Sequence, residues 1–144
     1  MIDPFWDAAH ACYCRRYRRL ARMFEVISMM LSSHAVSAEI EIGDGSKFWH
    51  HGLGCVAWSG VHIGNNCKIF QNVTFGNKFG KQIENCVGGV HVGDNCVIGA
   101  GAVILGHITI GNDVSIGANA VVNRDIPDHC MAVGVPARII RKEE

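Results

Sequence analysis

The sequence lacks both a net charge and any long apolar run. Its 13 lysines and arginines balance 13 aspartates and glutamates, so electrostatics give no argument for binding nucleic acid or a membrane surface. No apolar run is long enough to span a bilayer, and no signal peptide is recognisable. We therefore expect a cytoplasmic protein with no nucleic-acid partner and no membrane insertion, whose seven cysteines are reduced thiols.

A six-residue repeat occupies residues 92–122. An aliphatic residue opens each block, at Val92, Ile98, Ile104, Ile110, Ile116 and Val122. Glycine usually follows it, and the fifth position is small or β-branched, as at Cys96 and Ala102. A period of six residues excludes an amphipathic helix, whose period is about 3.6 residues, and it is longer than the two-residue period of an ordinary strand. Because like residues at this spacing stack coil over coil, the repeat predicts a mainly β fold, a parallel β-helix of hexapeptide repeats.

The repeat extends back towards residue 36 but is interrupted twice. Phe48 and Ile63 are 15 residues apart, three more than two blocks, and Phe75 and Val92 are 17 apart, five more than two blocks. Insertions in solenoids usually form loops on the binding face, so we expect functional residues at both interruptions. The second interruption is interpreted as an inserted loop, residues 77–89, which is either a solvated surface loop or a lid or acceptor-binding segment.

Residues 1–33 do not follow the six-residue rule and are expected to form a helical segment ahead of a β-helix domain over residues 34–144. One helix from Asp7 to Leu31 is predicted, because apolar residues recur at spacings of three and four at Leu20, Met23, Phe24, Ile27 and Leu31. This stripe needs a partner, either the side of the β-helix or a neighbouring subunit. Five arginines on the other faces form either a solvated surface or a site for anionic ligands: Arg15, Arg16, Arg18, Arg19 and Arg22.

Two adjacent histidines, His50 and His51, mark the first interruption. Counting back in sixes from Ile63 places Ala57 and then His51 at positions where an aliphatic side chain would stack. A polar ring there gives up apolar burial, and broken local patterns are typical of functional sites. We interpret His51 as functional, whereas His50 is more simply explained as a histidine that hydrogen-bonds the turn.

Four segments resemble the hexapeptide-repeat acyltransferases, which form left-handed β-helices, and within them most closely serine O-acetyltransferase. The segments are residues 51–56, 69–76, 98–102 and 132–138, which together span roughly residues 36–141. The hexads and the Gly-Val-Pro-Ala-Arg ending occur throughout the family and imply acetyl-CoA as acyl donor. The His-Gly-Leu-Gly segment at residues 51–54 is more specific to the serine branch. The resemblance also implies a homotrimer with active sites between subunits, and no metal.

The resemblance implies roles for individual residues. His51 matches the catalytic histidine, and an imidazole, whose ordinary pKa is about 6.5, suits the removal of a proton from an acceptor hydroxyl. Acetyl transfer would be direct, with a backbone N–H among residues 52–55 stabilising the oxyanion. The residues expected along the acyl-CoA groove are Ala100, Ala118, Asn123 and Arg138. The candidates for binding the acceptor are His50, Lys78 and Lys81.

Three departures from the serine-acetyltransferase pattern concern the acceptor. His50 replaces an aspartate, the aspartate that usually partners the histidine would fall near His34 and Ala35, and Gly88-Gly89 replaces an Arg-His pair. A sugar or polysaccharide hydroxyl is therefore the alternative acceptor.

Three further readings stay open. Cys55 could be an acylated nucleophile with His51 as its base. A γ-class carbonic anhydrase shares the fold but needs three zinc-binding histidines, and the eight histidines show no obvious match to that spacing. A non-catalytic scaffold would show no effect of His51→Ala in any assay.

Overall fold

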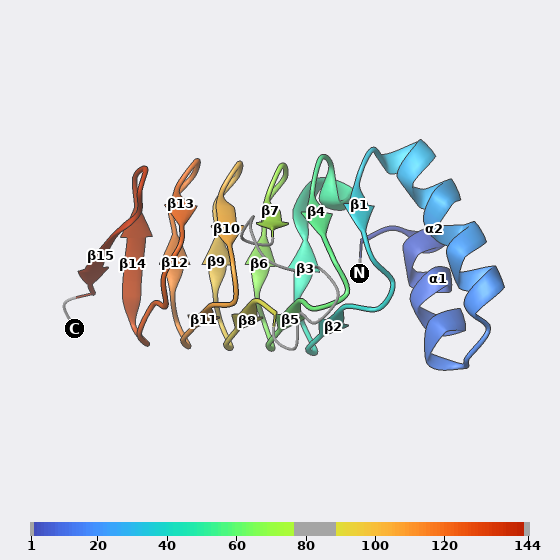
Figure 1. Ribbon diagram of the computed structural model, residues 1–144, viewed down its shortest axis with the longest axis horizontal. Helices are drawn as coiled ribbons and strands as arrows, with labels where there is room; N and C mark the ends of the chain where they lie inside the picture. Colours follow the sequence, from blue (N-terminus) through green and yellow to red (C-terminus); the bar gives the residue numbers. More distant parts are fainter. Residues whose placement is uncertain (1, 77–88, 143–144) are drawn as a thin grey trace.

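The computed structural model describes residues 2–76 and 89–142 of the 144-residue chain. It is a left-handed parallel β-helix, a three-sided solenoid, with a helical hairpin packed at one end (Figure 1). The hairpin consists of α1 (Pro4–Cys14) and α2 (Arg18–Ser32). None of the described helices is both long and apolar enough to cross a bilayer.

The strands of the described chain form three sheets, one for each side of the solenoid. The first sheet contains β1 (Ala35–Val36), β4 (Val56–Ala57), β7 (Thr74–Gly76), β10 (Val103–Leu105) and β13 (Val121–Val122). The second contains β2 (Glu41–Ile42), β5 (His62–Ile63), β8 (His91–Val92) and β11 (Thr109–Ile110). The third contains β3 (Lys47–Phe48), β6 (Lys68–Ile69), β9 (Val97–Ile98), β12 (Ser115–Ile116), β14 (Cys130–Val133) and β15 (Arg138–Arg141). All pairings are parallel except β14 with β15, where the chain folds back at the end of the solenoid.

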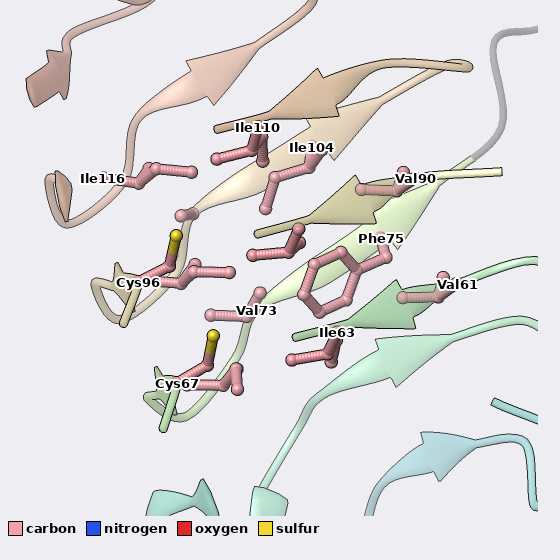
Figure 2. Packing of buried hydrophobic residues seen from close by; sticks show 14 of the residues in the cluster. Val61, Ile63, Cys67, Val73, Phe75, Val90, Cys96, Ile104, Ile110 and Ile116 are labelled. Atoms are coloured by element: carbon pink, nitrogen blue, oxygen red, sulfur yellow. The ribbon is translucent and has the colours of Figure 1, made fainter. Parts of the chain in front are cut away.

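The interior is built from stacked columns of like residues. Phe75 pairs in register with Ile104, and Ile104 with Val122, and all three side chains are buried. Figure 2 shows such side chains from successive coils filling one continuous core. The repeat thus brings an apolar residue, usually aliphatic, to the core from the strands of successive coils, which confirms the predicted fold.

Two cysteines fill small interior positions, as the repeat predicts. Cys67 and Cys96 are both buried, and each thiol lies 3.1 Å from a backbone carbonyl of the next coil, Gly93 and Gly111 respectively. Each thiol therefore acts as a compact core side chain that also satisfies a hydrogen bond.

The prediction of a single helix from Asp7 to Leu31 is wrong. α1 ends at Cys14 and α2 begins at Arg18, and Arg16 between them takes a left-handed conformation with φ 64°. The apolar repeat that supported one helix lies entirely within α2. The arginine run spans the turn and the start of α2, and all five of its side chains are exposed.

The apolar stripe of α2 is only partly covered within this chain. Leu20, Met23 and Leu31 are 47%, 48% and 66% exposed, whereas Phe24 and Ile27 are partly buried. The fully buried positions of α2 carry small side chains, which let the helix approach its neighbours closely. Of the two partners expected for the stripe, the described part of this chain leaves three of the five residues exposed, and a neighbouring subunit stays a prediction.

Both interruptions of the repeat lie at corners of the solenoid. The connection from β3 to β4 has seven residues (49–55), whereas the equivalent connections in the next three coils have four (70–73, 99–102 and 117–120). The second interruption lies between β7 and β8. Most of it, including Lys78 and Lys81, lies outside the described residues.

Candidate active site

The extra residues at the first corner form a tight turn that carries both histidines. The chain makes a short 3-10 element, Trp49–Gly52, within which three consecutive residues have positive φ: His50 at 55°, His51 at 55° and Gly52 at 68°. A left-handed non-glycine residue costs roughly 1–2 kcal/mol, although histidine is among the residues that tolerate it best. Strain of this kind persists only where the surroundings fix the backbone, and it is concentrated at functional sites.

His51 does not occupy a stacking position, contrary to the count in sixes. Ala57 is buried in β4 as counted, but the three extra residues in the corner displace His51 from the next aliphatic column onto the exposed turn. His50 is exposed beside it. The imidazoles are therefore accessible to ligands, which a core histidine would not be.

The turn is supported by residues that precede the β-helix. A Cβ atom built at Gly52 would lie 3.1 Å from Cγ2 of Ile2 and 3.8 Å from Cδ2 of His34, so both side chains lie close against the turn. The N–H of Gly54 donates to the carbonyl of Ser33 at 3.0 Å. On the other side, the Trp49 ring stacks on Phe70, with ring centroids 5.9 Å apart. The histidine turn is thus held between the hairpin and the second coil.

A surface cavity of about 560 Å³ adjoins this turn. It is lined on one side by Ile2, Asp3 and Pro4, and on the other by Lys47, Phe48, Trp49, His50 and His51. The structure thus brings His50 and His51 together at one cavity. The N-terminal wall of the cavity was not predicted from the sequence. Its signal was Asp3-Pro4, a helix N-cap followed by proline at the first helical position.

Asp3 is buried and uses both carboxylate oxygens. Oδ1 accepts from the N–H groups of Phe5 and Trp6 at 2.9 Å, which caps α1. Oδ2 accepts from the Ser28 hydroxyl at 2.6 Å and lies 2.9 Å from Nε2 of His34. Burial alone would raise the pKa of Asp3, but hydrogen bonds, led by that from Ser28, outweigh it and hold the pKa well below its usual range. The carboxylate is therefore ionised at neutral pH.

Cys55 is poorly suited to be an acylated nucleophile. It is fully buried, its thiol lies 3.3 Å from the carbonyl of Phe70, and burial raises its pKa. A nucleophilic cysteine needs an accessible thiolate, so this reading does not fit the structure.

Three of the four candidate acyl-CoA residues, Ala100, Ala118 and Arg138, lie along the same corner of the solenoid as the histidine turn, whereas Asn123 follows β13 at the next corner. The turns of successive coils are joined by backbone hydrogen bonds: Asn72 to Leu53 (2.8 Å), Gly101 to Gln71 (3.0 Å) and Asn119 to Ala100 (2.9 Å). Ala100 is partly exposed and Ala118 is exposed on this edge. At its far end a cavity of about 710 Å³ is lined by Arg124, by residues 133–137, and by Arg138 and Ile139. Asn123 is exposed next to Arg124 but does not line this cavity.

No group of three histidine, cysteine or acidic side chains that could hold a metal occurs among the described residues. Two surface histidines do lie together on the second sheet, where the rings of His62 and His91 stack with centroids 4.6 Å apart.

The chain matches known families and proteins along most of its length. The family model for the bacterial transferase hexapeptide (six repeats) matches residues 89–124, and that for the hexapeptide repeat of succinyl-transferase matches residues 52–75. The serine acetyltransferase of Synechococcus elongatus is 39% identical over 139 residues, which covers 92% of this chain and 52% of that protein. The serine acetyltransferase of Helicobacter pylori is 38% identical over 137 residues, which covers 94% of this chain and 77% of that protein.

A solved structure gives the same relationship. Soybean serine acetyltransferase complexed with serine superposes with a TM-score of 0.84 at 34% identity, covering 94% of this chain and 54% of that one. The chain thus spans about half the length of the Synechococcus and soybean proteins. The resemblance read from the sequence is confirmed, and the chain belongs to the serine acetyltransferase family of hexapeptide-repeat proteins.

Proposed function

We propose that this chain is an acetyl-CoA-dependent serine O-acetyltransferase in which His51 is the general base. The observation that carries the proposal is the position of the His51 turn: it is exposed beside a cavity at one end of the corner along which Ala100 and Ala118 follow. An acceptor hydroxyl in the cavity and a thioester lying along the corner would meet at the imidazole.

The chemistry requires a base, because the acceptor hydroxyl must lose its proton as the new C–O bond forms. The imidazole of His51 takes this proton, and the hydroxyl oxygen attacks the thioester carbonyl carbon. The resulting tetrahedral intermediate expels the thiolate of CoA, which the protonated imidazole can reprotonate. Transfer is direct, and it needs no metal and no covalent intermediate on the enzyme.

The oxyanion of the intermediate needs a hydrogen-bond donor. The N–H groups of Leu53, Gly54 and Cys55 already donate to the carbonyls of His50, Ser33 and Gly52, at 3.1, 3.0 and 2.8 Å. Of the four amides proposed for this role, that of Gly52 directly follows His51, and we propose it as the donor.

L-Serine is favoured over a sugar as acceptor. Family membership supports this choice. The cavity wall also carries charges of both signs, Asp3 and Lys47, which suits the ammonium and carboxylate groups of an amino acid better than a neutral sugar. We keep His50, Lys78 and Lys81 as proposed acceptor-binding residues.

The acyl donor is proposed to lie along the corner. Small side chains at Ala100 and Ala118 leave room for the pantetheine arm, and Arg138 and Arg124 at the far cavity carry positive charge that suits phosphate groups. Asn123 stays a proposed contact beside them.

The active unit is proposed to be a cytoplasmic homotrimer with sites between subunits. Apolar side chains on the outside of the first sheet support this, since Val56 is 43% exposed and Val103 and Val121 are partly exposed in the same sheet. A flat sheet with such residues suits packing against a second copy.

The test is an acceptor screen with release of the CoA thiol as readout. L-Serine, simple sugars and sugar nucleotides are each offered with acetyl-CoA, and the oligomeric state is measured by light scattering on the same sample. Thiol release that depends on L-serine supports the proposal. Thiol release with a sugar and none with L-serine refutes the proposal that serine is the acceptor. No thiol release with any acceptor refutes the proposed acetyltransferase activity.

A further inference from the structure

The left-handed turn that carries His51 needs support from outside itself. His50, His51 and Gly52 all have positive φ, and the side chains of His50 and His51 are exposed, so neither anchors the turn by burial. A strained conformation of this kind is stable only where surrounding contacts fix it.

On the side opposite the second coil, the contacts that fix it come from the N-terminal segment. Ile2 and His34 both lie against Gly52, and Ser33, the residue before His34, accepts a hydrogen bond from Gly54. Ile2 precedes α1 and His34 follows α2, so this support comes from the two segments that enter and leave the helical hairpin. Packing of α1 on α2 brings these segments near each other, and a direct contact between them fixes their relative position.

A buried polar cluster joins them. The Asp3 carboxylate, next to Ile2, accepts a hydrogen bond from the Ser28 hydroxyl and lies within hydrogen-bond distance of Nε2 of His34. Ser28 is 0% exposed, His34 3% and Asp3 5%. A buried, charged cluster held by these hydrogen bonds has one strongly preferred geometry, because each broken contact would leave a further unsatisfied polar group.

We propose that Ser28 and His34 are positioning residues for His51: by holding Asp3, they fix residues 2–4 against the left-handed turn and so set the direction of the general base. This inference rests on the proposed function for its kinetic consequence. Neither side chain lines the cavity beside His51. They act through Asp3, through Ile2 and through the backbone of Gly52.

The cluster also explains why His34 keeps a buried nitrogen without a partner. Nδ1 of His34 has no hydrogen-bond partner in the described chain, which costs free energy. A leucine or methionine would fill the space without that cost but could not donate to Asp3. The histidine is retained, on this account, for its Nε2 contact.

The experiment compares His34→Leu, which removes the donor, with His34→Gln, which can place an amide N–H near the position of Nε2. Ser28→Ala is the second, smaller perturbation, in case His34→Leu does not fold. His62→Leu is the matched control, since His62 contacts Glu41 on the second sheet, away from the cluster. For each variant, kcat and the KM values for L-serine and acetyl-CoA are measured, together with hydrogen exchange at the amides of residues 53–55.

We expect His34→Leu and Ser28→Ala to lower kcat about tenfold or more, since a small misplacement of a catalytic group has effects of this size. The KM for acetyl-CoA should stay within about twofold of wild type, because the proposed acyl-CoA groove runs along later coils of the solenoid, away from the cluster. The amides of residues 53–55 should lose protection, and His34→Gln should restore both readouts. Unchanged kcat and unchanged protection at these amides in a folded variant would overturn the proposal, as would equal losses in His62→Leu.

The two hypotheses fail in different ways. If the wild-type protein does not acetylate serine, the proposed function fails, while the exchange measurement still reports whether the cluster holds the turn. If the wild type is active and the cluster variants keep both full activity and full protection, the positioning role fails and the function stands.

Discussion

Replacing His51 by asparagine tests the proposed base without disturbing the fold. The backbone of His51 is left-handed, with φ 55° and ψ 28°, and asparagine is among the residues that adopt this conformation most readily. Alanine at the same position would add a conformational cost of about 1 kcal/mol. Because the His51 side chain is exposed, His51→Asn should change the free energy of unfolding by no more than about 0.5 kcal/mol.

The effect on catalysis should be large by comparison. A general base typically contributes at least about a hundredfold, which corresponds to roughly 2.7 kcal/mol of transition-state stabilisation. We expect His51→Asn to lower kcat by this factor or more, measured as CoA thiol release at saturating L-serine and acetyl-CoA. His51→Ala should show a similar loss of kcat with a lower midpoint of thermal unfolding.

His50→Asn is the matched control for this prediction. His50 has nearly the same backbone conformation, φ 55° and ψ 38°, and is exposed beside His51. Its replacement should keep kcat within a few-fold of wild type while raising the KM for serine. If His51→Asn retained kcat within about threefold of wild type, or if both variants lost activity equally, the assignment of His51 as base would be refuted.

Three further predictions follow from the described contacts. Gly54→Ala should destabilise the fold by about 1–2 kcal/mol or more in urea unfolding, because φ is 66° and the new Cβ would collide with Oδ1 of Asn72. Gly134→Ala, which also has positive φ but whose Cβ would make only an ordinary contact with the Pro136 carbonyl at 3.7 Å, should cost less. The pKa of Asp3 is depressed in the folded state, so its ionised form stabilises the fold above about pH 4, and this stabilisation is lost as the pH falls below that. The free energy of unfolding of Asp3→Asn should therefore depend less on pH between about 5 and 2 than that of the wild type. Parallel pH profiles for the two proteins would contradict this. Ala100→Trp should raise the KM for acetyl-CoA by about tenfold or more with little change for serine, because the large ring would fill the corner of the solenoid, and an unchanged KM for acetyl-CoA would exclude Ala100 from the groove.

The sequence was sufficient to predict the fold because one rule repeats. Each aliphatic residue from Val92 to Val122 faces a like residue in the next coil, so the period alone determines the stacking. The histidine turn could be located for the same reason, as a break in that rule at a known place. The conformation of this turn could not be predicted, because the six-residue period does not tell which residues of an insertion stay stacked in the core and which move to the surface.

The N-terminal part was harder, since its packing depends on residues far apart in the chain. The apolar spacing of α2 predicted a buried face that includes Leu20 and Met23, but both are about half exposed, and the fully buried positions of α2 are the small residues Ala21 and Ser28. Asp3 became important only through hydrogen bonds to residues 25 and 31 positions away. Local pattern carries no information about such partners.

The solenoid also sets a distance. The turn of His51 and the turn that leads to Arg138 belong to the same corner, four coil steps apart, and each step of a parallel sheet measures about 4.8 Å, so the two ends are separated by about 19 Å. The number of coils therefore sets the separation between the proposed base and Arg138. Adding or deleting one whole coil between them would keep both residues and would still change this separation by about 4.8 Å, so that it no longer matches the length of the pantetheine arm.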